Sequence, residues 1–420
     1  MGFCNVGGFR FQAACIALAA ILAGASAAAQ KGDEPPPVFT ASALLTPAVA
    51  KGEHYTVGDT VRTEGYFHEF TLSSPFGAFE AVGRSELAVR IQEINALAAL
   101  QDVSKTEVFL AAAGQSVVKV GQSAAGVVTD PAGTAKGIGA GIKRFGVNLG
   151  RRTQRAVEST DDSDTASAGQ TKDKDTAAES AAKGVLGVTA AMRRWARKVG
   201  VDPYTTNVVL RQALSDIGKV DAAGSIATKV VLPIPAVVGL TSTVGDLVWS
   251  KDPEEVRKIN EQRLRELTVS EDVAKALFKN PSFTLTYQTR LVAGLRAVNV
   301  TGCADYVKTA AEARNEREAL FFVESAEILQ QWHSRQPVRA VLTDSRAMVA
   351  ASRDGRARVL LPLDWVRWTA ATASALNEIH ARARSDLKAT HLQLALTGRP
   401  SDRAAREIKT RGWEIVLPTQ

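Results

Sequence analysis

The chain has 420 residues, a formal net charge of +7 and 45% hydrophobic residues, which is typical of a globular protein with two or three folded regions. It has three cysteines, and two of them, Cys4 and Cys15, lie within the first 29 residues. If that segment is removed, Cys303 stands alone, so an intramolecular disulfide is excluded.

The first 29 residues have the pattern of a secretory signal peptide. Arg10 is the one charged residue, an apolar run follows from Ala13 to Ala23, and Gly24 to Ala29 are small residues that offer A-x-A cleavage sites. The apolar run is too short to span a bilayer, which takes ~20 residues. We therefore expect export to the periplasm or the extracellular space.

The next segments predict a small sheet followed by helices. Residues 30–50 are rich in proline and alanine and predict an extended tether. Within residues 51–157, polar and apolar residues alternate from Tyr55 to Val82, which predicts an antiparallel meander of two to four strands. Apolar residues at helical spacing from Leu87 to Leu100 then predict a helix, and Ala/Gly-rich helices are expected to follow.

A basic segment ends this region. Between Pro131 and Val157 there is no acidic residue. Its basic residues are Lys136, Lys143, Arg144, Arg151, Arg152 and Arg155. Two interpretations stay open: the segment contacts anionic lipid or another envelope component, or its apolar face packs on its own fold. The segment lacks interleaved aromatic residues, which argues against a nucleic-acid partner.

The rest of the chain predicts a linker and two further regions. Residues 158–183 are acidic and lack large apolar side chains, which predicts a disordered linker. Residues 184–336 read as a helical domain. Residues 337–420 predict a small α/β domain in which a β-hairpin, turning at Asp354–Gly355, precedes a parallel βαβ unit. The expected fold class is thus α+β and predominantly helical.

The carboxyl ends of the C-terminal strands are the best candidate for a ligand pocket. The candidate residues are Asp364, Thr397, Gly398, Arg399 and Ser401. Backbone N–H groups of the loop, together with the Arg399 guanidinium, would hold an anion. The alternative for the loop is an ordinary capped loop. The alternative for Asp364 is a helix N-terminus, with Trp365 and Trp368 as aromatic packing anchors.

Signatures of local chemistry are weak elsewhere. The five histidines form no zinc-binding spacing, and the glycine run from Gly137 to Gly141 is an incomplete phosphate loop. We therefore predict no catalytic residues, no metal and no cofactor. A non-enzymatic protein is the leading expectation, and an enzyme is kept as the alternative.

Two strings resemble segments of uncharacterised exported proteobacterial proteins: TDPAGTAKGIGAGIKRF, from Thr129 to Phe145, and LPLDWVRWT, from Leu361 to Thr369. The resemblance implies export and a shared fold, and it carries no activity or site residues.

The sequence therefore predicts an exported, non-enzymatic, envelope-associated interaction protein that contacts anionic membrane surface through its basic segment. The alternative is a periplasmic small-ligand-binding protein or enzyme that uses the C-terminal α/β domain. The oligomeric state is left open.

Overall fold

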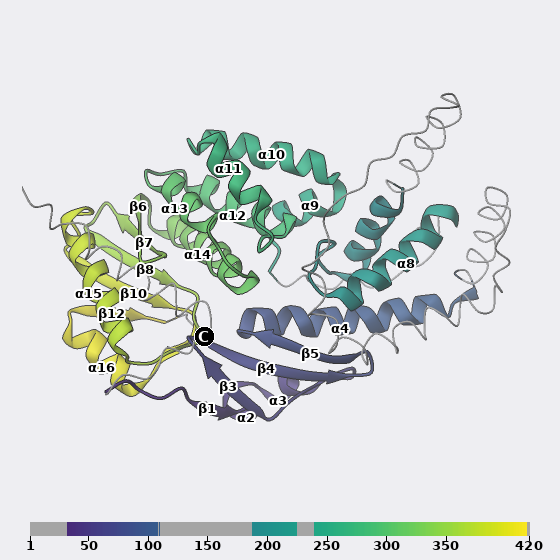
Figure 1. Cartoon of the computed structure of the whole chain (residues 1–420), viewed down its shortest axis with the longest axis horizontal. Coiled ribbons are helices and arrows are strands. Elements are labelled where there is room, and N and C mark those ends of the chain that lie inside the picture. The colour runs from purple at the N-terminus through teal and green to yellow at the C-terminus, as the bar shows by residue number, and fades with distance from the viewer. Residues whose placement is uncertain (1–31, 108, 110–186, 225–238, 418–420) are drawn as a thin grey trace, which may run out of the picture.

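A computed structural model of the chain describes residues 32–107, 109, 187–224 and 239–417. Figure 1 shows an N-terminal sheet, a helical middle and a C-terminal sheet, which confirms the predicted α+β class. Three predicted features lie outside the described residues: the signal peptide (1–29), the basic segment with its six lysines and arginines, and the acidic linker (158–183).

The N-terminal sheet is the predicted antiparallel meander with one additional strand. Its strands are β1 (Val38–Thr40), β2 (Thr56–Val57), β3 (Thr60–Glu64), β4 (Phe67–Ser74) and β5 (Gly77–Val82). β4 is central, since it pairs with β2, β3 and β5. In β3 the side chains alternate between buried and exposed, as expected for a sheet with one covered face.

The tether expected over residues 30–50 needs a correction. β1 pairs antiparallel with β3, and two short helices, α2 (Ala41–Leu44) and α3 (Pro47–Ala50), follow it. The strand forms because Val38–Thr40 can add backbone hydrogen bonds to the free edge of β3, and the extended backbone that the prolines before it favour is compatible with a strand.

The helix α4 (Arg84–Ser104) carries the predicted apolar stripe and covers the N-terminal sheet. Its buried Leu87, Ile94 and Leu97 share one core with Phe70 and Leu72 of β4. On its other side α4 contacts α8 (Val208–Gly224), and a helix over 187–199 joins the same core. α4 is therefore packed on two sides, and few of its positions face solvent.

Six helices lie between residues 242 and 335, and we call them the helical middle. They are α9 (Ser242–Ser250), α10 (Pro253–Glu266), α11 (Glu271–Lys279), α12 (Leu285–Val298), α13 (Cys303–Ala310) and α14 (Glu316–Arg335). α12 and α14 approach closely at Gly294, where a Cβ atom would lie 3.1 Å from the backbone of Ala326. Cys303 is a buried free thiol, as expected for a small core residue.

The C-terminal sheet has the order β12-β10-β8-β7-β6. Its elements are β6 (Val338–Asp344), β7 (Ala347–Ser352), β8 (Arg356–Leu361), α15 (Ala370–Ser385), β10 (His391–Leu396), α16 (Asp402–Thr410) and β12 (Trp413–Val416). β6, β7 and β8 are antiparallel, whereas β10 is parallel to both β8 and β12. The predicted hairpin and βαβ unit are both confirmed.

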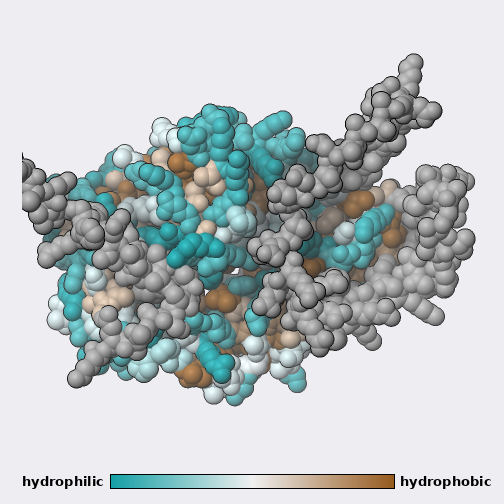
Figure 2. Space-filling view, in the orientation of Figure 1, coloured by the Kyte–Doolittle hydropathy of each residue, from teal (hydrophilic) through white to brown (hydrophobic). Residues whose placement is uncertain are grey.

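The visible surface of the described residues is largely hydrophilic over α10 and α11, with apolar side chains scattered among the polar ones (Figure 2). Within the described ranges, none of the helices combines the length and the apolar character that crossing a bilayer requires.

Asp364 ties the N-terminal sheet to the C-terminal region. It is only 8% exposed, and its carboxylate accepts the backbone N–H groups of His68, at 2.9 Å, and Arg84, at 3.3 Å. Its own backbone N–H donates to the carbonyl of Tyr66. Because Arg84 is the first residue of α4, this carboxylate also places a negative charge at the positive end of the helix dipole.

Replacing Asp364 with alanine should loosen this junction. D364A leaves a buried N–H of His68 without an acceptor, so we expect the free energy of unfolding to fall by about 2 kcal/mol. Hydrogen exchange measured by mass spectrometry should show lost protection in peptides covering residues 66–86. The control is D59A, at an exposed aspartate. Unchanged protection in D364A would contradict this role.

Candidate functional site

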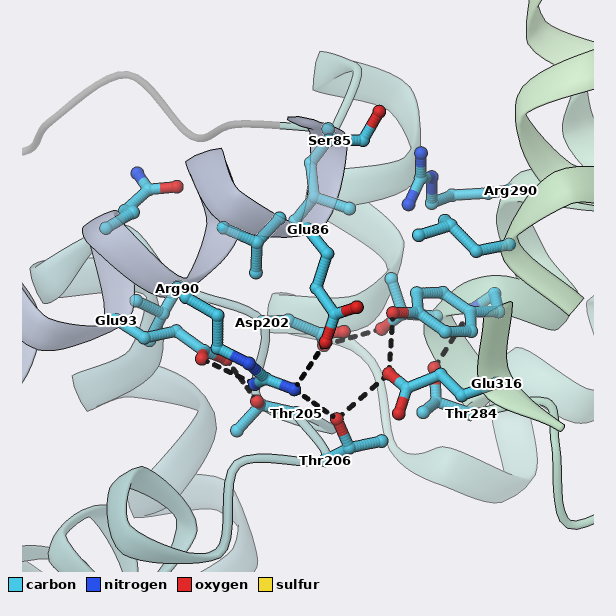
Figure 3. Close-up of a pocket in the computed structure, with 18 of the residues that line it drawn as sticks. Ser85, Glu86, Arg90, Glu93, Asp202, Thr205, Thr206, Thr284, Arg290 and Glu316 are labelled. Carbon is cyan, nitrogen blue, oxygen red and sulfur yellow. Dashed lines mark hydrogen bonds and ion pairs between the residues drawn. The ribbon is translucent and has the colours of Figure 1, made fainter. Parts of the chain in front are cut away.

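A polar cavity of about 280 Å³ lies where α4, the segment over 201–206, α12 and α14 meet (Figure 3). Six carboxylic side chains line it: Glu86, Glu93, Asp202, Glu316, Glu324 and Glu327. The described lining residues include two basic side chains, Arg90 and Arg290, and no lysine or histidine. The formal charge of the lining is therefore strongly negative. We call this site the acidic cavity.

Arg90 and its two acidic partners form one wall of the acidic cavity. Its guanidinium donates to Glu93 at 2.7 Å and to Glu86 at 3.0 Å. The three residues share one face of α4 because they are three and four positions apart. Burial lowers the pKa of Arg90, but the carboxylates of Glu93 and Glu86 raise it more, so the guanidinium stays charged.

The loop before α8 completes the polar contacts of Glu93, which is only 2% exposed. Its carboxylate accepts hydrogen bonds from the Thr205 hydroxyl and from the Asn207 amide. The side-chain oxygen of Asn207, Oδ1, accepts the backbone N–H groups of Val209 and Leu210 and so caps the start of α8. Glu93 is thus bound by one cation and two neutral donors, as a buried carboxylate requires.

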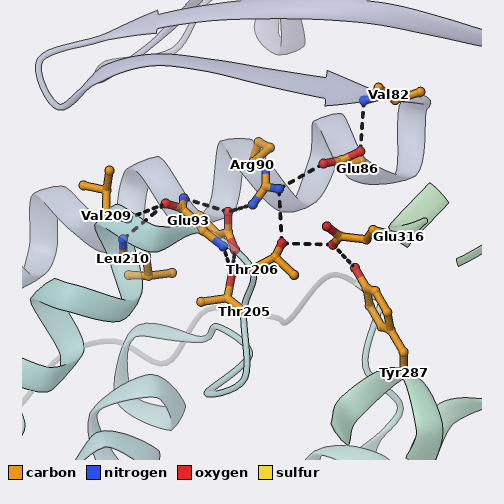
Figure 4. Close-up of polar contacts among 11 residues, drawn as sticks. Val82, Glu86, Arg90, Glu93, Thr205, Thr206, Val209, Leu210, Tyr287 and Glu316 are labelled. Carbon is orange, nitrogen blue, oxygen red and sulfur yellow. Dashed lines mark hydrogen bonds and ion pairs between the residues drawn. The ribbon is translucent and has the colours of Figure 1, made fainter. Parts of the chain in front are cut away.

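Thr206 carries the network across to the helical middle (Figure 4). Its hydroxyl accepts from Arg90 at 3.4 Å and donates to Glu316 of α14 at 2.9 Å. The Tyr287 hydroxyl donates to the same oxygen of Glu316 at 3.0 Å. Burial, together with the negative charge of Glu316, raises the pKa of Tyr287 well above its usual value. Because Glu86 also accepts the backbone N–H of Val82 in β5 at 3.0 Å, one chain of contacts joins β5, α4, α14 and α12.

Asp202 occupies the base of the acidic cavity. One of its oxygens accepts the Thr286 hydroxyl at 2.6 Å and the Tyr204 N–H at 2.8 Å. Burial raises the pKa of Asp202 to about 6 although both hydrogen bonds lower it. Burial likewise raises the pKa of Glu86. Among the described residues, neither Asp202 nor Glu316 forms an ion pair.

The remaining carboxylates of the acidic cavity are on α14. Glu327 holds Arg290 through two hydrogen bonds of 2.8 and 2.9 Å. Glu324 accepts from Arg317 at 2.7 Å with one oxygen. The other oxygen of Glu324, Oε1, is buried and has no hydrogen-bond partner among the described residues. One oxygen of a carboxylate that lines the acidic cavity is therefore unpaired among the described residues.

Metal ions require a tighter grouping of ligands than this site offers. In the described ranges, no three carboxylate, histidine or cysteine side chains lie together as a metal ion would need. The carboxylates are instead distributed over α4, α14 and the segment over 201–206, and each accepts from its own donors.

The structure brings four of the five predicted pocket residues together, in a cleft that is separate from the acidic cavity. Asp364, Thr397, Gly398 and Arg399 line a second cleft of about 730 Å³, between the N-terminal sheet and the C-terminal region. Ser401 is not among its lining residues, because its hydroxyl caps α16 and donates to Glu34. We call this site the arginine cleft.

The expected anion contacts of the loop backbone do not form in the arginine cleft. The N–H groups of Thr397, Arg399 and Ser401 already donate to carbonyl groups of Leu361, Asp364 and Val366. Gly398 is required at its position because a Cβ atom would lie 1.9 Å from the Asp364 carbonyl oxygen. The role of these residues in ligand binding stays a prediction, with Arg399 as the remaining donor.

Sequence reasoning missed the acidic cavity. The spacing of Glu86, Arg90 and Glu93 was a detectable signal, since charged residues three and four apart share a helix face that otherwise reads as apolar. Nothing in the local sequence connects this face with Asp202 or Glu316, which lie more than a hundred positions away.

Comparisons of the chain with family models, with curated protein sequences and with solved structures find no match.

Removing the charge of Asp202 should stabilise the protein at neutral pH. A carboxyl whose pKa is raised to about 6 binds its proton more tightly in the folded than in the unfolded chain, so its contribution to stability falls as the pH rises from about 4 to about 6. At ~1.4 kcal/mol per pKa unit, D202N should exceed the natural chain by on the order of 2–3 kcal/mol at pH 7.5.

Urea denaturation at pH 4 and pH 7.5 checks this expectation. The advantage of D202N should be present at pH 7.5 and small at pH 4, and D272N, at an exposed aspartate, should show little change at either pH. A variant less stable than the natural chain at pH 7.5 would show that the Asp202 charge is fully compensated.

Proposed function

We propose that this chain is an exported binding protein for a small organic cation, which it holds in the acidic cavity. The observation that carries the proposal is the excess of negative charge around this cavity: six carboxylic side chains line it with two arginines, Arg317 pairs with Glu324 from outside the lining, and Asp202 and Glu316 form no ion pair among the described residues. Export is supported by the N-terminal sequence pattern alone.

The buried carboxylates favour a positively charged ligand. A charge removed from water is costly unless a countercharge or several hydrogen bonds replace the lost hydration. Asp202 and Glu316 receive only neutral hydrogen-bond donors among the described residues. The N–H groups of an ammonium or guanidinium ligand would supply the charged donors that these two carboxylates lack.

The size and walls of the acidic cavity favour an organic cation of modest size. Its volume of about 280 Å³ is at the lower end of small-molecule sites. Val89, Val201, Leu240 and Leu320 also line it and would contact a hydrocarbon part of the ligand. An amine with a short carbon chain satisfies both requirements.

The environment of Asp202 supports binding as well. A carboxyl group that lines a cavity and whose pKa is raised by burial is typical of a functional site. The proposed site differs from the alternative drawn from the sequence, since the acidic cavity is built by α4, α12 and α14 and not by the C-terminal α/β region.

Calorimetric titration at pH 7.5 with 1,4-diaminobutane, agmatine and 2-phenylethylamine tests the proposal. We expect at least one of these amines to bind, and E316Q and D202N each to weaken it about tenfold or more, because each removes a charged hydrogen-bond acceptor. The matched controls are E261Q and D272N, at exposed carboxylates of α10 and α11. The proposal fails if no amine binds or if E316Q binds like the control.

A second candidate function rests on the basic segment between Pro131 and Val157. Six basic residues without one acidic residue favour contact with anionic lipid headgroups. This proposal is independent of the acidic cavity, because it concerns residues outside the described ranges.

Co-sedimentation with anionic and neutral vesicles at low and high salt tests the second function. We expect salt-sensitive binding to anionic vesicles only, abolished when Lys143, Arg144, Arg151 and Arg152 are all changed to glutamate. The control reverses four exposed charges of α10 and α11 instead: Arg257, Lys258, Arg265 and Lys279. Equal loss in the control would indicate a net-charge effect and not a membrane-contact segment.

A further inference from the structure

The arginine cleft has the opposite charge to the acidic cavity. Its described lining includes two guanidinium groups, those of Arg84 and Arg399, and one carboxylate, that of Asp364. Both oxygens of Asp364 are already bound to the backbone N–H groups of His68 and Arg84. The two arginines therefore outnumber the carboxylate, and that carboxylate is occupied.

The two guanidinium groups are available for a ligand. Arg84 and Arg399 are both exposed, and within the described part of the chain neither side chain forms an ion pair or a hydrogen bond. They come from different elements: Arg84 begins α4, and Arg399 is in β11 (Arg399–Pro400), which pairs with β9 (Trp365–Val366). Two arginines from separate elements that border one cleft can each offer paired N–H donors to an oxyanion.

The wall of the arginine cleft is aromatic and apolar. Phe39 packs edge to face against Trp365, with ring centroids 5.1 Å apart, and against His68, with centroids 5.3 Å apart. Leu44 and Leu417 extend this wall. Burial and the nearby Arg84 charge lower the pKa of His68 to about 4, and Thr63 is hydrogen-bonded to its Nδ1 at 2.8 Å. His68 is therefore neutral at pH 7 and, being only 1% exposed, packs against Phe39 and supports this wall from within.

We infer that the arginine cleft binds a small organic carboxylate, with its oxygens on Arg84 and Arg399 and its aromatic or aliphatic body against Phe39 and Trp365. The volume of about 730 Å³ lies within the range of small-molecule sites. A free inorganic anion would leave the apolar wall unused, and a neutral apolar ligand would leave both guanidinium groups unpaired.

This second site is distinct from the acidic cavity although the two are neighbours. Arg84 lines the arginine cleft, whereas Ser85 and Glu86, the next residues of α4, line the acidic cavity. The first turn of α4 therefore separates a site for an anion from a site for a cation, and variants at Arg84 and Arg399 remove no carboxylate from the acidic cavity.

Fluorine NMR with a matched pair of probes, 4-fluorobenzoate and 4-fluorobenzylamine, tests the inference. We expect 4-fluorobenzoate to bind the natural chain, and R84Q/R399Q to weaken that binding at least tenfold without changing the affinity for any amine that the acidic cavity takes. R84K/R399K keeps the charge but not the paired donors, so its affinity for 4-fluorobenzoate should be intermediate. The matched control R257Q/R265Q removes two exposed arginines from α10.

Two outcomes would overturn the inference: no binding of 4-fluorobenzoate to the natural chain, or equal binding by R84Q/R399Q and R257Q/R265Q. Circular dichroism and the urea midpoint show whether each variant is folded. Because E316Q affects only the proposed amine site, the amine and carboxylate proposals can fail separately.

Discussion

The buried ion pair between Arg90 and Glu93 is the constraint on which the centre of this structure depends. Two charges removed from water are tolerated only when their remaining donors and acceptors are bound, so Glu93 also takes Thr205 and Asn207. Asn207 in turn caps α8, and Arg90 reaches Thr206 and through it Glu316. Satisfying one buried pair thus fixes α4 against α8 and against the helical middle, and leaves the acidic cavity between them.

A second constraint acts at the N-terminus of the same helix, α4. Asp364 bonds the first N–H of α4 and the N–H of His68, which fixes the N-terminal sheet to the C-terminal region. The first turns of α4 are therefore held by two polar contacts of different origin, and one proposed binding site lies beside each. A ligand in either site would contact elements from distant parts of the chain, which is the usual position of small-molecule sites between folded units.

The candidate sites could be predicted from the sequence only in part. Arg399 was identified because it follows a strand of a recognisable βαβ pattern, and Asp364 because it lies just after the preceding strand, beside Trp365 and Trp368; both line one cleft. The ligand contacts expected from the loop backbone were already used within the fold, and Arg84 was not considered because it is 315 positions from Arg399. The acidic cavity escaped prediction for the same reason, since Glu86, Asp202 and Glu316 converge from three separate regions.

The sequence alone determined several of the elements, because their signals are local. Alternation predicted the meander that contains β3 to β5, the 3.6-residue period predicted α4, and the Asp354–Gly355 turn with its flanking strands predicted the hairpin of the C-terminal sheet. Only the tertiary structure decided which charged side chains meet. Ion pairing and desolvation depend on distance in space, and a local pattern carries no record of the partner that a distant segment brings to the same cavity.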